Sequence, residues 1–374
     1  MSPLFPVPLV SVSGPPAESG AAYGAAAAEQ IARNIEAYGR RFAVQAGLDT
    51  AAVHAAGAEY RLATAEHHPR IAEMLDAVAE GAGVPVDAIY ALNARTELIY
   101  GALVGPAGSP DAADGGCTAL GVLGTHTASG HLLIGQNWDW HPEQRDAMLL
   151  LRTTDERGHT VLTLTEAGML AKTGLNSAGV GLCVNMLGSG QDGLGQPGVP
   201  YHVMLRAALE ADCLAAALRA TVRPPRTSSI NMLIGQAGDS GGELIDVELA
   251  PGEAGWLHPV DGVLTHANHF EAPVPVYDTI KDWGGSSMFR AARARRLLGE
   301  PAATGKVTED DLIAVFRDHA SYPSAICKHD DNREPYYDRS ETLYSILIDL
   351  DDRRIAIAPG PPCRDTYTWF PLTP

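Results

Sequence analysis

The chain has 374 residues, of which 45% are apolar and 19% are charged, a balance typical of a folded globular protein. Its 45 acidic and 27 basic residues give a formal net charge of −18, which argues against binding nucleic acid through phosphate contacts. No apolar stretch reaches the roughly 18 residues of a membrane-spanning helix, and residues 1–12 lack the basic start of a signal peptide. We therefore expect a cytoplasmic protein with no membrane or nucleic-acid partner.

The first 116 residues are predicted to be mostly helical. Helices are expected over residues 21–46, 68–80 and 87–100, where helix-forming residues and apolar repeats are concentrated, and a short strand is expected at residues 9–12. Residues 105–116 contain four Gly, two Pro and two Asp, a composition typical of a loop. This loop divides a helical segment, 1–116, from the remainder, 117–374.

From residue 117 onward the pattern changes to strands joined by turns. Hairpins are expected at 117–137, 147–165, 170–185 and 342–358, with single strands at 230–235, 244–249 and 263–265. Helices are expected at 201–210, 214–221, 287–298 and 309–319. Groups of strands followed by groups of helices indicate an α+β fold in layers.

Cys117 is the strongest candidate for a catalytic residue, because it begins a strand directly after the flexible, glycine-rich loop. A thiolate there can attack the carbonyl of Gly116, and hydrolysis of the resulting thioester would leave Cys117 as a new N-terminus. The α-amine of such a residue has an ordinary pKa of about 7.7–8.0 and can accept the thiol proton. The alternative is a small buried residue at the start of a strand. The other four cysteines are given no role.

The sequence gives no sign of a cofactor or a metal. It lacks the phosphate-binding GxxxxGK[ST] loop and the HExxH zinc motif. His266 and His269 are spaced like metal ligands, but no carboxylate or cysteine stands at a known spacing from them. We expect neither a cofactor nor a metal site.

Seven short motifs occur in an order that resembles the autoproteolytic cysteine N-terminal nucleophile (Ntn) hydrolases of the isopenicillin N acyltransferase family, also called acyl-CoA:6-aminopenicillanate acyltransferases. They are Ala91-Leu-Asn-Ala-Arg-Thr-Glu97, Asp114-Gly-Gly-Cys-Thr118, Gly135-Gln-Asn-Trp-Asp139, Thr165-Glu-Ala-Gly168, Gly174-Leu-Asn-Ser-Ala-Gly-Val180, Thr265-His-Ala-Asn-His269 and Thr342-Leu-Tyr-Ser-Ile-Leu-Ile348. The resemblance implies a four-layer αββα sandwich with an N-terminal helical pro-segment. It also implies self-cleavage between Gly116 and Cys117, with both pieces kept in one globular unit.

The resemblance also implies the site residues. Asp139, 22 residues after Cys117 and across one hairpin, holds the new α-amine and the substrate. Asn268 donates to the oxyanion, and Arg339 favours the thiolate or pairs with Asp139 or a substrate carboxylate. Asn185, which ends the strand expected after the Asn176-Ser-Ala-Gly179 turn, is a candidate for a second polar contact to the acyl carbonyl.

Trp138 is a candidate for the wall of the acyl pocket. The chain departs from the family at Ala325-Ile-Cys-Lys328, where the family often has Ser-Ile-Cys-Arg, and at Asp338, which stands in place of a Ser. Both changes can shift the preferred acceptor away from a penam nucleus.

The predicted function is acyl transfer through a Cys117 thioester, from a small-molecule amide or an acyl-CoA to an amine or to water. An amidase of the penicillin V acylase or bile-salt hydrolase type is the alternative, although such enzymes normally lack a segment as long as residues 1–116. A non-catalytic binding protein on the same fold is a third, more remote reading.

Overall fold

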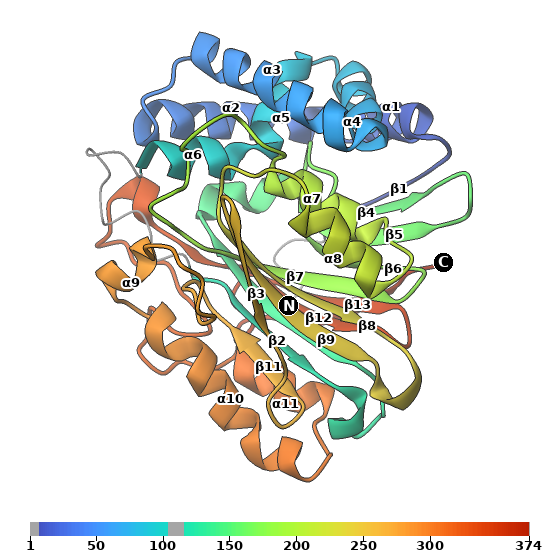
Figure 1. Cartoon of the computed structure of the whole chain (residues 1–374), viewed down its shortest axis with the longest axis vertical. Coiled ribbons are helices and arrows are strands. Elements are labelled where there is room, and N and C mark those ends of the chain that lie inside the picture. The colour runs from blue at the N-terminus through green and yellow to red at the C-terminus, as the bar shows by residue number, and fades with distance from the viewer. Residues whose placement is uncertain (1–6, 104–115, 374) are drawn as a thin grey trace.

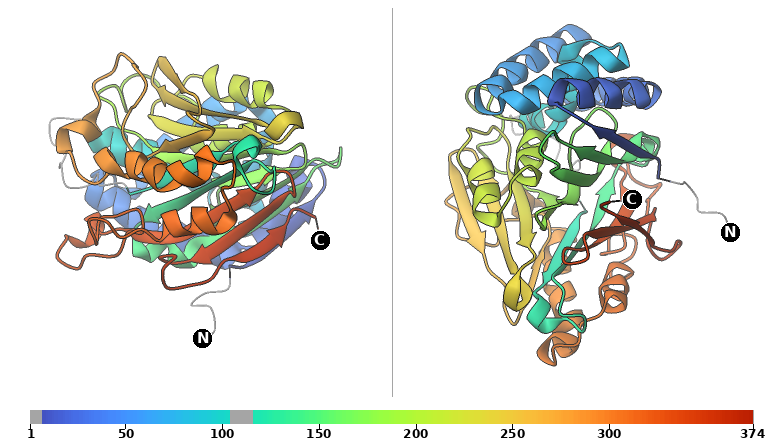
Figure 2. Two further views of the ribbon diagram at one scale, coloured as in Figure 1. Left: turned by 90° about the horizontal axis from the view of Figure 1, so that it is seen from below. Right: turned by 90° about the vertical axis from the view of Figure 1, so that its right-hand side faces the viewer.

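Two β-sheets packed face to face form the centre of the molecule (Figures 1 and 2). The computed structural model describes residues 7–103 and 116–373. The loop predicted for residues 105–116 therefore lies outside the described residues, apart from Gly116.

The first sheet has eight strands in the order β1-β4-β5-β6-β7-β8-β9-β10. Their bounds are β1 Leu9–Ser13, β4 Met148–Thr154, β5 Thr160–Glu166, β6 Thr173–Asn176, β7 Val180–Met186, β8 Ile230–Gln236, β9 Glu243–Ala250 and β10 Glu253–Leu257. Its neighbouring strands are antiparallel except for β1, which pairs parallel with β4.

The second sheet has six antiparallel strands in the order β11-β2-β3-β12-β13-β14. Their bounds are β2 Thr118–Val122, β3 Leu133–Trp140, β11 Val263–His266, β12 Glu341–Asp349, β13 Arg354–Pro359 and β14 Thr368–Pro371. The hairpin predicted after Cys117 is confirmed, because Thr118 of β2 lies opposite Asn137 of β3. This register brings the end of β3 next to the start of β2.

Helices cover the outer face of each sheet. Helices α7 (Tyr201–Leu209) and α8 (Leu214–Val222) pack on the eight-stranded sheet, and α10 (Ser287–Ala303) and α11 (Glu309–Phe316) pack on the six-stranded sheet. Every residue of β2, β3, β5, β7 and β12 is buried, as expected for strands covered on both faces. The predicted four-layer αββα architecture is confirmed.

The helices of the N-terminal segment gather at one end of this sandwich (Figures 1 and 2). They are α1 Pro16–Ala26, α2 Ala28–Gln45, α3 Thr50–His67, α4 Pro69–Ala82, α5 Val86–Asn93 and α6 Arg95–Leu103. A further short helix, α9 (Thr279–Trp283), belongs to the later part of the chain and precedes α10. The segment also contributes β1 to the larger sheet. None of the described helices is both long and apolar enough to cross a membrane.

Two of the predicted helices are each divided into two helices in the structure. The helix expected over 21–46 is broken at Ala27, and that over 87–100 is broken at Ala94; both alanines leave helical geometry with φ near −100° to −115°. Alanine carries no turn signature, so tertiary packing sets these breaks and the composition does not reveal them. Helix α3 was not predicted as a separate element.

A buried carboxylate joins the N-terminal helices to the sheets. Glu166, the fully buried last residue of β5, accepts hydrogen bonds from Lys172 Nζ (2.6 Å), Arg95 Nε of α6 (3.2 Å) and the Tyr38 hydroxyl of α2 (2.6 Å). Burial alone would raise the pKa of Glu166, but the charges of Lys172 and Arg95 outweigh burial and lower it to about 2. Glu166 is therefore ionised at neutral pH and holds elements that are far apart in the sequence.

Replacing Glu166 by Gln should destabilise the fold markedly, because two buried cations would lose their shared anion. Breaking a buried pair by removing one partner costs about 3–5 kcal/mol. We expect a lower urea midpoint for Glu166→Gln, measured in a Cys117→Ala chain so that self-cleavage cannot intervene. The exposed pair of Glu156 with Arg70 offers a control. Glu156→Gln should leave the midpoint in place, and an equal loss in both variants would contradict the prediction.

Candidate active site

Cys117 lies at the start of β2, inside the molecule. Its side chain is 6% exposed, and its thiol lies 3.8 Å from the backbone carbonyl oxygen of Asp139, at the end of β3. The β2–β3 register produces this proximity, so the predicted pairing of Cys117 with Asp139 across one hairpin has a direct structural basis.

Gly116 is closely packed against two side chains, which would have to move to make room for a larger residue. A Cβ atom built on Gly116 would lie 2.3 Å from Asp139 Oδ2 and 2.7 Å from Lys328 Cδ, far inside van der Waals contact. The Asp139 carboxylate therefore rests against the residue that precedes Cys117. Its other oxygen, Oδ1, accepts a hydrogen bond from the Thr342 hydroxyl at 2.6 Å. Strand β12, which carries Thr342, thus fixes the carboxylate beside the Gly116–Cys117 peptide bond.

Arg290 of α10 also binds this junction, and the sequence analysis did not identify it. Its Nη1 donates to the carbonyl oxygens of Gly116 (2.8 Å) and Cys117 (2.5 Å) and to the Thr118 hydroxyl (2.8 Å). Arg290 is fully buried, so this cation acts on the Gly116 carbonyl with little screening by water. The sequence feature that could have indicated Arg290 is its place on the apolar side of α10, beside Ala291 and Ala294, which are also buried.

Asn268 is joined to this network. It follows β11, and its Oδ1 accepts from Arg290 Nη2 at 2.9 Å while its Nδ2 donates to the carbonyl of Met186 at 2.9 Å. An amide nitrogen carries two N–H donors, and no second acceptor is found among the described residues. Asn268 thus has a donor left for an oxygen that enters the site.

A small cavity brings the site residues together. Its volume is about 20 Å³, enough for a single water molecule. It is lined by Arg95, Cys117, Trp138, Asp139, Trp140, Lys172, Val184, Met186, Tyr201, His202 and Asn268. Four of the predicted site residues, Cys117, Asp139, Asn268 and Trp138, therefore meet in one place.

The cavity is rich in buried cations. Burial raises the pKa of the Cys117 thiol to about 11, and the charge of Asp139 adds to this, while Arg290 and Lys172 act in the opposite direction. Burial lowers the pKa of Lys172 to about 7, and the neighbouring charge of Arg95 contributes to the lowering. In the full-length chain the Cys117 thiol is therefore protonated at neutral pH. The pKa of the Lys172 amine, on the same cavity wall, lies close to neutral pH.

His202 of α7 is a second residue that the sequence analysis did not identify. Burial holds the pKa of His202 well below its ordinary value, so the ring is neutral. Its Nδ1 lies 3.0 Å from the carbonyl of Asn93, which assigns the proton to Nδ1. Its Nε2 is buried and has no hydrogen-bond partner among the described residues, so it offers an acceptor at the cavity wall.

Two predicted site residues do not line the cavity. Asn185 lies on β7 between Val184 and Met186, which do line it, and its Oδ1 accepts instead from Asn231 Nδ2 at 3.3 Å. Arg339 donates from Nε and Nη2 to the carboxylate of Asp330, and its side chain is 27% exposed. The cations that act on Cys117 are Arg290 and Lys172.

The histidines weighed as metal ligands have other partners. His266 Nε2 lies 2.8 Å from Glu248 Oε1, and His269 Nδ1 lies 2.9 Å from the Ser287 hydroxyl. Burial alone would lower the pKa of His266, but the hydrogen bond to Glu248 outweighs it and raises the pKa to about 9. His266 and Glu248 therefore form an ion pair that connects the two sheets.

Comparison with solved structures gives distant neighbours. Penicillin V acylase from Agrobacterium tumefaciens is 14% identical with a TM-score of 0.46, over 69% of this chain and 86% of that one. A mutant conjugated bile acid hydrolase from Clostridium perfringens is 14% identical with a TM-score of 0.42, over 64% of this chain and 89% of that one.

Comparison with known sequences is more specific. The acyl-coenzyme A:6-aminopenicillanic-acid-acyltransferase 40 kDa form of Emericella nidulans is 28% identical over 364 residues, which cover 94% of this chain and 92% of that protein. The model of the acyl-coenzyme A:6-aminopenicillanic acid acyl-transferase family matches residues 125–363, well over half of the chain. The protein therefore belongs to this family, and the predicted class of enzyme, one that transfers acyl groups or acts on amide bonds, is confirmed.

Proposed function

We propose that the chain cuts itself between Gly116 and Cys117 and then uses the new N-terminal Cys117 to carry acyl groups. The donor is a small amide or an acyl-coenzyme A, and the acceptor is an amine or water. The observation that supports this most strongly is the arrangement at the junction: a buried thiol follows a carbonyl that accepts from a buried guanidinium.

The first reaction is an N-to-S shift. Cys117 Sγ attacks the carbonyl carbon of Gly116, the C–N bond to Cys117 breaks, and the nitrogen leaves as an amine after gaining a proton. Arg290 stabilises the negative charge that forms on the Gly116 oxygen, because it already donates to that oxygen at 2.8 Å. Water then hydrolyses the thioester, which releases a carboxylate at Gly116 and a free thiol at Cys117.

The second reaction repeats this chemistry on a substrate. The thiol attacks the acyl carbonyl, and the donor's amine or coenzyme A leaves. The acceptor then attacks the Cys117 thioester and takes the acyl group, which releases the thiol. The free α-amine of Cys117 takes up the thiol proton at neutral pH. Asp139 orients that amine, and the remaining N–H of Asn268 donates to the oxyanion. Arg339 and Asn185 stay predictions, because each would have to exchange its present partner for substrate.

The cut pieces are expected to act as one unit, with residues 1–116 as the partner of residues 117–374. Arg95 of the first piece lines the same cavity as Cys117 and binds Glu166 of the second. Acyl-coenzyme A and 6-aminopenicillanic acid are the substrates in the name of the Emericella nidulans relative. We propose the same classes of donor and acceptor here, a thioester or amide and an amine.

Self-cleavage and acylation can be tested on the same protein. Denaturing gels of the wild type should show chains of 116 and 258 residues, which co-elute on gel filtration, while Cys117→Ala should stay at 39.4 kDa. Incubation with a panel of acyl-coenzyme A and N-acyl amine substrates should then add one acyl mass to the 258-residue chain. An active wild type that remains uncut, or an adduct elsewhere, would refute the proposal.

Arg290→Lys should slow self-cleavage by about 10- to 100-fold, because one ammonium group cannot bind the junction and at the same time reach Asn268 and Ser286, as the three guanidinium nitrogens do. The measurement is the rate at which freshly synthesised precursor disappears on a denaturing gel. Arg296→Lys, on an exposed part of the same helix, is the matched control and should cleave at the wild-type rate. Equal rates for Arg290→Lys and wild type would remove Arg290 from the mechanism.

The pH dependence of cleavage should report the group that deprotonates the thiol. Lys172 lines the cavity with Cys117, and its surroundings are Glu166, Arg95 and His202. Below about pH 7 Lys172 is protonated and cannot accept a proton; above it, the neutral amine can. The cleavage rate after a pH jump should therefore rise through pH 7 and then level off.

Lys172→Arg provides the contrast, since an arginine keeps its proton throughout. Its slower cleavage should keep rising past pH 8, toward the thiol pKa of about 11. Identical profiles for the two proteins would show that Lys172 is not the base.

A further inference from the structure

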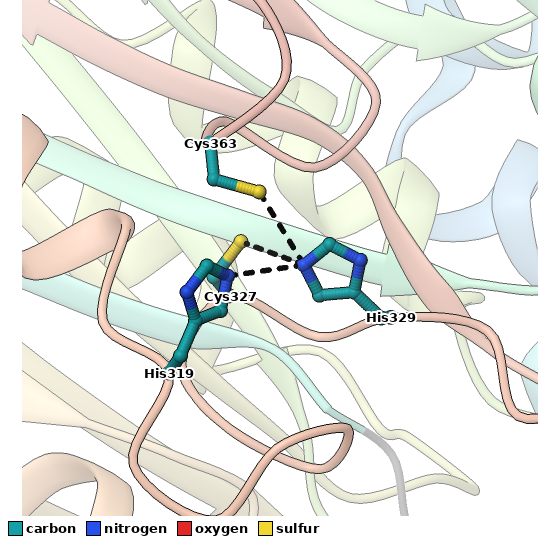
Figure 3. Close-up of side chains that lie close together, drawn as sticks. All are labelled: His319, Cys327, His329 and Cys363. Carbon is teal, nitrogen blue, oxygen red and sulfur yellow. Dashed lines mark hydrogen bonds between the residues drawn. The ribbon is translucent and has the colours of Figure 1, made fainter.

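Four side chains that could bind a metal lie close together, and none of them lines the active-site cavity. His319 follows α11, Cys327 and His329 belong to the segment before β12, and Cys363 follows β13 (Figure 3). One ligand atom from each residue lies within 4.8 Å of the others. Figure 3 shows the two thiols and the His319 ring all turned toward one nitrogen of His329.

The three distances from His329 Nε2 are close to those between the ligands of a tetrahedral zinc ion. His329 Nε2 lies 3.1 Å from His319 Nε2, 3.6 Å from Cys327 Sγ and 3.4 Å from Cys363 Sγ. With Zn–N bonds of about 2.0–2.1 Å and Zn–S bonds of about 2.3 Å, tetrahedral ligand nitrogens lie about 3.3 Å apart, and a nitrogen and a sulfur about 3.6 Å apart.

Hydrogen bonding alone does not account for this cluster. A single ring nitrogen of His329 faces three partners, yet it can donate or accept along only one lone-pair direction. The two cysteines are not joined by a disulfide. A cation placed between the four atoms would satisfy all of them together.

We propose that His319, Cys327, His329 and Cys363 bind one structural Zn²⁺. Two thiolates and two imidazoles are ligands that select zinc over the hard cations Mg²⁺ and Ca²⁺, and two thiolates neutralise its charge. Four protein ligands leave no open position, so the ion supports the fold and does not act on substrate.

The site would fasten the loop that reaches the cleavage junction. Lys328 lies between two of the ligands, and its side chain is next to Gly116. Its backbone exchanges hydrogen bonds with Thr342, the residue that donates to Asp139. Asn137 of β3 donates to the Ile326 carbonyl at 2.8 Å. An ion bound here would hold this loop against β3 and β12.

The test uses the full-length Cys117→Ala chain, in which the active-site thiol cannot bind metal. After purification without added chelator, elemental analysis should find one zinc per chain. After removal of the zinc, titration with Co²⁺ should saturate at one ion per chain, with the intense visible absorption of tetrahedral cobalt and a thiolate-to-cobalt band. Zinc should raise the melting temperature of the stripped chain.

The variant and its control separate this site from adventitious binding. Cys363→Ser changes an exposed residue and should lose the cobalt spectrum and the zinc-dependent rise in melting temperature. Cys213→Ser, at the start of α8, should keep both. A stripped chain that gives no tetrahedral cobalt spectrum, a Cys363→Ser chain that binds like the control, or a Cys327–Cys363 disulfide in the purified protein would each overturn the proposal.

Discussion

The ionised, fully buried carboxylate of Glu166 is the interaction on which the arrangement of this molecule depends. A buried anion is stable only when cations and hydrogen-bond donors surround it. Here the donors come from α2, α6 and the segment after β5, so the N-terminal helices and the larger sheet must meet at this point. The Trp140 indole of β3 donates to the Tyr38 hydroxyl at 2.9 Å, which extends the network to the smaller sheet.

The same network sets the electrostatics of the active site. Lys172 Nζ, held by Glu166, lies 3.9 Å from the centre of the Trp138 ring, and the Arg95 guanidinium lies 4.2 Å from that of Trp140. Both tryptophans line the cavity with Cys117. The cationic character of the cavity therefore depends partly on Arg95, a residue that precedes the proposed cleavage site. In this arrangement the N-terminal segment is a wall of the site, which explains why it would stay bound after a cut.

The sequence revealed the part of this structure that rests on local signals. Strand alternation and turn residues predicted the β2–β3 hairpin, and with it the proximity of Cys117 and Asp139. It did not reveal Arg290, which binds the Gly116–Cys117 junction, or Lys172 and His202, which line the cavity, because each comes from an element far away along the chain. The ligand spacing of the cluster around His329 likewise matches no familiar metal motif, with seven residues between His319 and Cys327, one between Cys327 and His329, and 33 between His329 and Cys363. Arg339 was assigned by resemblance and Asn185 by its place at the end of an expected strand, and in the full-length chain each has a different partner.

In the proposed self-cleavage, the glycyl group of Gly116 is the first acyl group transferred to Cys117. The packing around Gly116 therefore indicates which acyl groups of a substrate would fit the same position. A substrate carbonyl attacked by Cys117 must take the place of the Gly116 carbonyl, so the adjoining acyl carbon takes the place of the Gly116 Cα. A branch there in the direction of a Cβ would meet the Asp139 carboxylate and the Lys328 side chain, both well inside contact distance. A CH₂ group next to the acyl carbonyl has no branch in that direction and does not make this contact. If cleavage occurs as proposed, the close packing around Gly116 therefore also favours acyl groups that are unbranched next to the carbonyl.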